Sequence, residues 1–447
     1  MRGKSMARVN VEETIAISGL RLPKQVIEYY GDTVLSMASK LIDESRIPEW
    51  IDKLFAAEVY YAFYLPIPTL APAENIDSLR LAVLKVMLEE SSFWRVKPQT
   101  SLDRITSLVA SASFIERIAR LLPRSLASQL GDNNAGGGTG YNNVVRRAVE
   151  EALARAAKDA KTAKNLASIV YSSLPGSTSE LAFEDVLERI LLLSRNTDIS
   201  KVLDKISGVK IPGVKSRTVS RYSRGWIEGV EIGSDVERIH YSMFALPDEL
   251  FYALLAESRL LLYRKVVESV RGPVYVLMDK SGSMSGTKID WARAVAVALM
   301  IKSIKERRGF YARFFDASPH DLLYVKPTPK PKMIIEAMEH LANVRAGGGT
   351  DITRALVAAT TDISRRRVKQ GTDIVLITDG EDSLSAHVIE ELVKGVKARL
   401  HTVMIGGDNE TLRQVSDSYM KAVRLDEREM LKVVDFVKVR EAQHHKS

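Results

Sequence analysis

Three short segments of this chain carry oxygen-bearing side chains in an arrangement that suits a metal ion. The first reads Asp279-Lys280-Ser281-Gly282-Ser283, so an acid and two hydroxyls alternate along a turn. Alternate spacing directs these three side chains toward one point. The other two segments, GGGTDI and ITDGED, each add one ligand at the end or the start of a predicted element. The predicted metal ligands are Asp279, Ser281, Ser283, Thr350 and Asp379.

These candidate ligands supply five oxygen-bearing side chains but only two negative charges. A hard cation with about six oxygen ligands, some of them water, suits such a site. Mg²⁺ fits better than Ca²⁺, because Ca²⁺ takes more protein ligands than this set offers. We therefore expect one Mg²⁺ or Mn²⁺ per chain. Three further acids, Asp316, Glu381 and Asp382, are expected near the same rim, with Asp382 at the surface.

Catalytic patterns are missing from the sequence. The chain has no cysteine, which excludes disulfides, zinc-thiolate sites, iron-sulfur clusters and cysteine nucleophiles. The run from Gly282 to Gly286 does not have the G-x-S-x-G spacing of a serine nucleophile, and Gly286-Thr287-Lys288 is not the end of a phosphate-binding loop. No H-E-x-x-H pair occurs among the histidines. We therefore predict that the protein is not an enzyme.

The elements that must position the ligands lie in the last third of the chain. Short apolar runs alternate there with helical patterns, which predicts an α/β doubly wound (Rossmann-like) domain with a parallel sheet. In such sheets ligands bind beyond the carboxyl ends of the strands, so the candidate ligands should share one rim. The predicted strands are Val274 to Asp279, Phe310 to Asp316, Leu322 to Lys326, Asp373 to Asp379 and Leu400 to Gly406.

The first half of the chain shows a different pattern. Apolar residues recur there at steps of three and four, as in Ile105, Leu108, Ala112 and Ile115, which predicts an all-α helical domain. The predicted domains are 1–205, all-α; 206–272, a basic linker with connecting helices; 273–440, the α/β domain with the metal site; and 441–447, a tail. The segment 206–225 has no acidic residue and interleaves basic with aromatic side chains, so it is either a solvated linker or a nucleic-acid contact.

Charge and hydropathy limit the partners. A net charge of +8 favours acidic protein surfaces, nucleic acid or anionic lipid, without choosing among them. The most apolar stretch, AVAVALMI from Ala294 to Ile301, is too short to span a bilayer, and no signal peptide is recognisable at the N-terminus. We expect a cytoplasmic protein without a membrane span.

The combination of D-x-S-x-S with a separate Thr and a separate Asp resembles the metal-ion-dependent adhesion site (MIDAS) of von Willebrand factor A domains. All five positions match. The preceding stretches GVEIGSDVERI, LPDELFYALLAESRLLLYRK and RGPVYVLMDKSGSMSG resemble proteins that partner MoxR-type AAA+ ATPases, with the ViaA and CoxE-like groups nearest. This resemblance implies a helical region, a C-terminal von Willebrand A domain and a chaperone-like role in assembling or activating other complexes. It implies binding to the ATPase or its client through a carboxylate that reaches the metal.

Two other kinds of protein remain open. A helical module joined to a von Willebrand A domain, as in the Ro RNA-binding proteins, would use the basic charge for RNA. The chain shows no helical repeat of fixed period, which counts against that alternative. A signalling adaptor without an ATPase is the other alternative. RNA binding that weakens steeply with salt would distinguish the Ro-like protein from the rest.

Overall fold

The computed structural model describes residue 17 and the ranges 23–70, 78–122, 138–172, 180–207, 217–219, 226–268, 272–365, 368, 371–380, 382 and 385–436. Their helices and strands divide between two compact units.

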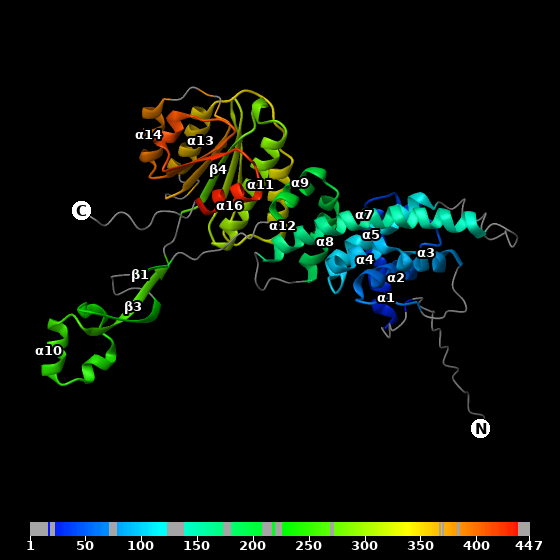
Figure 1. Cartoon of the computed structure of the whole chain (residues 1–447), viewed down its shortest axis with the longest axis horizontal. Helices are drawn as coiled ribbons and strands as arrows, with labels where there is room; N and C mark the ends of the chain where they lie inside the picture. The colour runs from blue at the N-terminus through cyan, green and yellow to red at the C-terminus, as the bar shows by residue number, and fades with distance from the viewer. Residues whose placement is uncertain are drawn as a thin grey trace. The chain divides into compact units, whose positions relative to one another are not determined.

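The first unit is helical, as the three- and four-residue periodicity predicted. It also takes in one helix from later in the chain, α12 (Pro331–Ala342). The other elements are α1 (Lys24–Ser39), η1 (Glu44–Arg46), α2 (Lys53–Tyr64), α3 (Ser78–Glu89), α4 (Ser91–Thr100), α5 (Arg104–Leu121), α7 (Gly138–Ser172), α8 (Glu180–Ser194) and α9 (Thr197–Ser207). In Figure 1, α5 and α7 lie side by side, and α5 is buried along most of its length.

Buried charges join the helices of this unit. Asp159 of α7 is fully buried and accepts hydrogen bonds from Ser113 (2.9 Å) and Arg155 (3.1 Å). Arg195, which follows α8, lies 2.6 Å from Glu116 and 3.2 Å from Asp159. Burial raises the pKa of Asp159, although the neighbouring arginines oppose that shift. Removing one partner of such a cluster would leave an uncompensated buried charge.

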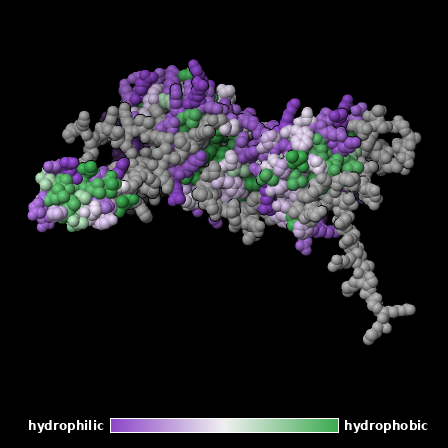
Figure 2. Space-filling model, turned by 60° about the horizontal axis from the view of Figure 1, so that its bottom comes forward, coloured by the Kyte–Doolittle hydropathy of each residue, from purple (hydrophilic) through white to green (hydrophobic). Residues whose placement is uncertain are grey.

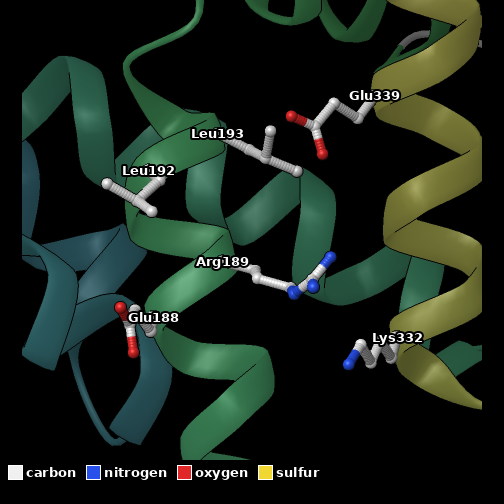
Figure 3. A pocket seen from close by; sticks show the side chains of 6 residues that line it. All are labelled: Glu188, Arg189, Leu192, Leu193, Lys332 and Glu339. Atoms are coloured by element: carbon white, nitrogen blue, oxygen red, sulfur yellow. The ribbon is translucent and has the colours of Figure 1, made fainter.

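Helix α12 packs against α8 and α9 within this unit. Arg189 of α8 pairs with Glu336 of α12 at 3.1 Å. A pocket of about 480 Å³ lies between the two helices, and Figure 3 shows acidic and basic side chains from both around it. Because α12 comes from the middle of the predicted α/β segment, the helical unit is built from two separate stretches of the sequence.

A three-stranded antiparallel sheet lies where the sequence predicted a basic linker with connecting helices. Its order is β1-β3-β2, with β1 (Arg217–Val219), β2 (Trp226–Gly233) and β3 (Leu260–Glu268). One connecting helix, α10 (Asp248–Ala256), does occur between β2 and β3, after the short turns η2 (Val236–Arg238) and η3 (Tyr241–Ala245). Helix α10 ends at Ala256, and Ser258 just beyond it has a φ of 56°. A glycine commonly occupies this left-handed position after a helix, so no glycine signal marks the boundary between α10 and β3. Strand β3 was therefore not separated from the connecting helices predicted within 206–272.

We call residues 226–264 the arm. Its own core is small, with only Ile239, Leu260 and Leu262 forming the buried cluster. Several large side chains of the arm are exposed, and Figure 2 shows hydrophobic, green surface on the arm. They include Val230, Ile232, Val236, Tyr241, Phe244 and Tyr252, each more than half exposed. Exposed apolar side chains gathered on one segment are a feature of protein-binding regions.

The predicted α/β architecture is confirmed in the second unit, with one strand direction corrected and one strand added. The six-stranded sheet has the order β6-β5-β4-β7-β8-β9. Its strands are β4 (Val274–Asp279), β5 (Phe310–Phe315), β6 (Pro319–Val325), β7 (Asp373–Thr378), β8 (Arg399–Ile405) and β9 (Ser418–Ala422). The pair β5 and β6 is antiparallel, whereas the prediction made the sheet parallel throughout. Only three residues join them, too few for the crossover that a parallel pair requires. The edge strand β9 was not predicted, because it is short and only half-buried.

Helices cover the two faces of this sheet. Alternate residues of β4, such as Tyr275 and Leu277, pack in one cluster with α13 (Ile352–Ser364) and α14 (Ala386–Gly395). The nearly fully buried α11 (Thr287–Lys305) contacts β4, β5 and α16 (Glu427–Phe436). The remaining elements are the turn η4 (Gly282–Met284) and α15 (Glu410–Val415). Strands β4 and β7 are buried at every position, so the residues at their ends are held rigidly.

Asp373, at the start of β7, anchors the amino end of the sheet. It is fully buried and is bonded by Arg308 and by Arg399 Nε, the latter at 2.7 Å. His401 Nε2 lies 3.6 Å from its carboxylate. Burial alone would raise the pKa of Asp373, but His401 and the two arginines outweigh it and lower the pKa to about 2.

We expect Asp373→Asn to destabilise the protein by about 2 kcal/mol at pH 7. Because the pKa is lower in the folded state, this contribution is complete above the unfolded pKa and is lost as the pH falls through about 2. The loss caused by the variant should therefore shrink by about half at pH 3 in urea denaturation. Asp321→Asn, on an exposed part of β6, is the control and should change stability by less than about 0.5 kcal/mol. Equal losses at both pH values would show that the carboxylate charge is not what stabilises β7.

Candidate metal centre

The first three predicted ligands meet at the carboxyl end of β4. Asp279 is the last residue of the strand and is fully buried, and Ser281 is almost as buried. Asp279 Oδ1 accepts the backbone N–H of Ser281 at 2.8 Å. The hydroxyls of Ser281 and Ser283 lie 3.1 Å apart. The turn therefore brings one carboxylate and two hydroxyls together, as their alternate spacing predicted.

The glycine run before Thr350 is fastened to this turn by its backbone. Gly282 N–H donates to the carbonyl of Gly348 at 3.0 Å, and Gly347 N–H donates to the carbonyl of Lys280 at 2.6 Å. Gly348 has a φ of 93°, and a Cβ there would lie 3.0 Å from the Cβ of Asp316. Glycine is therefore needed at this position for both conformation and space. The loop carries the half-buried Thr350 to the same rim of the sheet.

Asp379 follows β7, the strand next to β4. Its carboxylate is buried; Oδ2 accepts a hydrogen bond from Lys288 Nζ at 3.0 Å, and Oδ1 has no hydrogen-bond partner. The pKa of Asp279 is raised mainly by burial, and the negative charge of Asp379 adds to the shift. Each buried carboxylate raises the free-energy cost of ionising the other, and Asp379 keeps one oxygen without a partner among the described residues. A cation bound here would stabilise both negative charges.

Thr378 was missed in the sequence, yet it makes a short hydrogen bond to one of the predicted ligands. Its hydroxyl donates to Asp279 Oδ2 at 2.6 Å and accepts from Gly380 N–H at 3.1 Å. A side chain that orients a metal ligand in this way affects metal affinity without touching the ion. The only available signal was its place before Asp379 at the end of a predicted strand.

The acids predicted near the rim have different roles. Asp316 binds Lys280 Nζ at 2.7 Å and His320 at 2.9 Å. Burial would raise the pKa of Asp316, but the hydrogen bonds from these partners hold it well below its usual range. Asp382 was expected at the surface but is half-buried, and it accepts the backbone N–H of Ile352 at the start of α13 at 2.9 Å. Glu381 lies outside the described residues.

The residues present fit a small divalent cation. Across the described ranges, no group of three or more His, Cys, Asp or Glu residues could hold a metal ion, so an ion at this rim would depend on hydroxyl ligands. Two carboxylates and three hydroxyls form an oxygen-only set, which suits Mg²⁺ or Mn²⁺ and does not suit softer metals.

Comparisons with known proteins agree with this architecture. Residues 255–426 match the family described as "VWA domain containing CoxE-like protein". The chain carries a CoxE-like von Willebrand factor A (VWA) domain. VWA domains are generally non-enzymatic modules for protein interaction.

Relatives extend the likeness beyond the VWA domain. One uncharacterized protein of Methanocaldococcus jannaschii is 26% identical over 410 residues, covering 86% of this chain and 90% of the relative. A second from the same organism is 25% identical over 374 residues, covering 79% and 87%. A solved von Willebrand factor type A structure from Catenulispora acidiphila is 17% identical, with a TM-score of 0.31, and covers 38% of this chain and 43% of that one.

None of the helices in the described ranges combines the length and the apolar character that crossing a bilayer requires.

We expect Thr378→Val to weaken Mg²⁺ binding by about 10- to 100-fold, because Asp279 loses the hydroxyl that orients it. Isothermal titration with MgCl₂ measures the effect. The matched control is Thr402→Val in β8, which removes a buried hydroxyl bonded to Ser416 at 2.7 Å. If both variants bind Mg²⁺ equally well, Thr378 does not support the metal ligands.

Proposed function

We propose that the protein is a metal-dependent protein-interaction module, without enzymatic activity of its own, that acts as adaptor or co-chaperone to a MoxR-type AAA+ ATPase. The ligands would be Asp279, Ser281, Ser283, Thr350 and Asp379. The observation that carries the proposal is the buried, unpartnered Oδ1 of Asp379 beside the buried Asp279. When bound, Mg²⁺ would offer a coordination position that an Asp or Glu of a partner protein completes.

The protein's own residues prepare the site in two ways. Thr378 and the backbone of Ser281 hold the Asp279 carboxylate by its two oxygens, so its orientation is fixed before any ligand arrives. The hydroxyls of Ser281, Ser283 and Thr350 add oxygen atoms without adding negative charge. Two carboxylates balance a divalent ion but leave no excess negative charge to repel a third carboxylate.

Two features support a protein as the partner. Residues 255–426 match the CoxE-like family. The sequence around β2, α10 and β3 resembles that of proteins that work with MoxR-type ATPases in assembling or activating other complexes. The arm also exposes large apolar side chains, as protein-binding surfaces do. A Ro-like RNA-binding protein is the alternative, and its basic segment 206–225 falls mostly outside the described residues.

We expect Asp279→Ala, or removal of metal with EDTA, to weaken binding to the MoxR-type ATPase or its client by roughly 30-fold or more. The partner's carboxylate would lose its counter-charge in a partly buried contact. Surface plasmon resonance with the ATPase or client of the same organism measures this loss. Asp321→Ala, which removes an exposed carboxylate from β6, should bind as the wild type does.

Two outcomes would contradict the proposal. Complex formation insensitive to both EDTA and Ser283→Ala would place the interface elsewhere. Tight RNA binding with a steep salt dependence, and none to the ATPase or client, would favour the Ro-like alternative.

A further inference from the structure

The candidate metal centre contains a basic side chain, Lys288, that is not among the five predicted ligands. Lys288 lies in the first turn of α11, with its ammonium 3.0 Å from Asp379 Oδ2. Its side chain is 32% exposed, whereas that of Asp379 is 2% exposed. Lys288 thus engages one oxygen of Asp379 and leaves Oδ1 as the acceptor without a partner.

The place of Lys288 in its helix is electrostatically unfavourable. The first turn of a helix carries partial positive charge, which favours acids and disfavours a lysine by about 0.3–1 kcal/mol. Gly286, which precedes α11, has a φ of 79° and contributes no side-chain cap. Lys288 therefore does not stabilise the start of α11. Its ion pair with Asp379 offsets the unfavourable interaction with the helix dipole.

The second lysine near the rim does not share this property. Lys280 Nζ lies 2.7 Å from Asp316 Oδ2, so its charge is balanced by an acid that is not a predicted ligand. Lys288 is paired with a carboxylate that the cation would also use. With a divalent ion, the two predicted carboxylate ligands Asp279 and Asp379 sum to zero charge, and Lys288 adds a positive charge directly beside Asp379.

We propose that Lys288 is a positioning residue that sets the balance between two affinities of the site: it lowers the affinity for the divalent cation and raises the affinity for the incoming carboxylate. Its ammonium competes with the cation for the negative charge of Asp379 and restricts that ligand to one oxygen. The positive charge left over then attracts the carboxylate of the partner. This inference rests on the proposed function, because it assigns a role within the same site.

The first test measures Mg²⁺ alone. Isothermal titration of the full chain with MgCl₂ should show about tenfold tighter binding in Lys288→Met, since one positive charge a few ångströms away is removed. Lys288→Arg keeps the charge and should stay within about threefold of the wild type. The control is Lys421→Met in β9, whose lysine lies 3.7 Å from Asp408 and should leave Mg²⁺ binding unchanged.

The second test measures the partner. With saturating Mg²⁺, Lys288→Met should bind the ATPase or client about tenfold more weakly, opposite in sign to its effect on the ion. A role in folding alone would lower both affinities together with the melting temperature, and that result would overturn the inference. Unchanged Mg²⁺ affinity in Lys288→Met would also overturn it. Failure of the wild type itself to bind Mg²⁺ would instead overturn the proposed function.

Discussion

The burial of two carboxylates at the carboxyl end of the sheet is the constraint on which the site depends. Asp279 and Asp379 end or follow neighbouring central strands, where little water reaches them. A buried carboxylate is costly unless donors or cations compensate it. Thr378, the turn backbone and Lys288 supply part of that compensation, and Asp379 Oδ1 receives none from the described residues.

At the opposite end of the same sheet, the buried charge of Asp373 is fully compensated. Asp373 is as buried as Asp279, but two arginines bond it and His401 lies close by. Its pKa is lowered, whereas that of Asp279 is raised. The Asp373 cluster stabilises the fold, and its carboxylate oxygens are already bonded by arginines, so it offers no site for a cation. The cluster of Asp279 and Asp379 is suited to bind a cation, because the cation would pair with the carboxylate oxygen that has no other partner in the described part of the chain.

The division of the chain into units follows packing and not the order of the sequence. Helix α12 lies between β6 and the loop that carries Thr350, yet it packs with α8 and α9 in the helical unit. The residues that follow it, from Val344 to Thr350, bond with the Asp279 turn and with Arg293. One short segment of chain thus connects the helical unit to a predicted metal ligand. The arm adds exposed apolar side chains, a feature that protein-binding regions share.

The sequence by itself predicted the strands β4 and β7, the helical first half and the rim where the candidate ligands lie. These rest on local patterns, because buried strands are short apolar runs, and Asp279 and Asp379 stand at the ends of two of them. Tertiary structure decided the rest. Thr378 reaches Asp279 across 99 residues, and Lys288 reaches Asp379 across 91, and no local spacing encodes such pairs. The boundary between α10 and β3 was hidden because Ser258, and not a glycine, adopts the left-handed conformation just after α10. Which oxygen of Asp379 stays unpartnered was decided only by the packing of α11 beside β4, since that packing brings Lys288 to the rim.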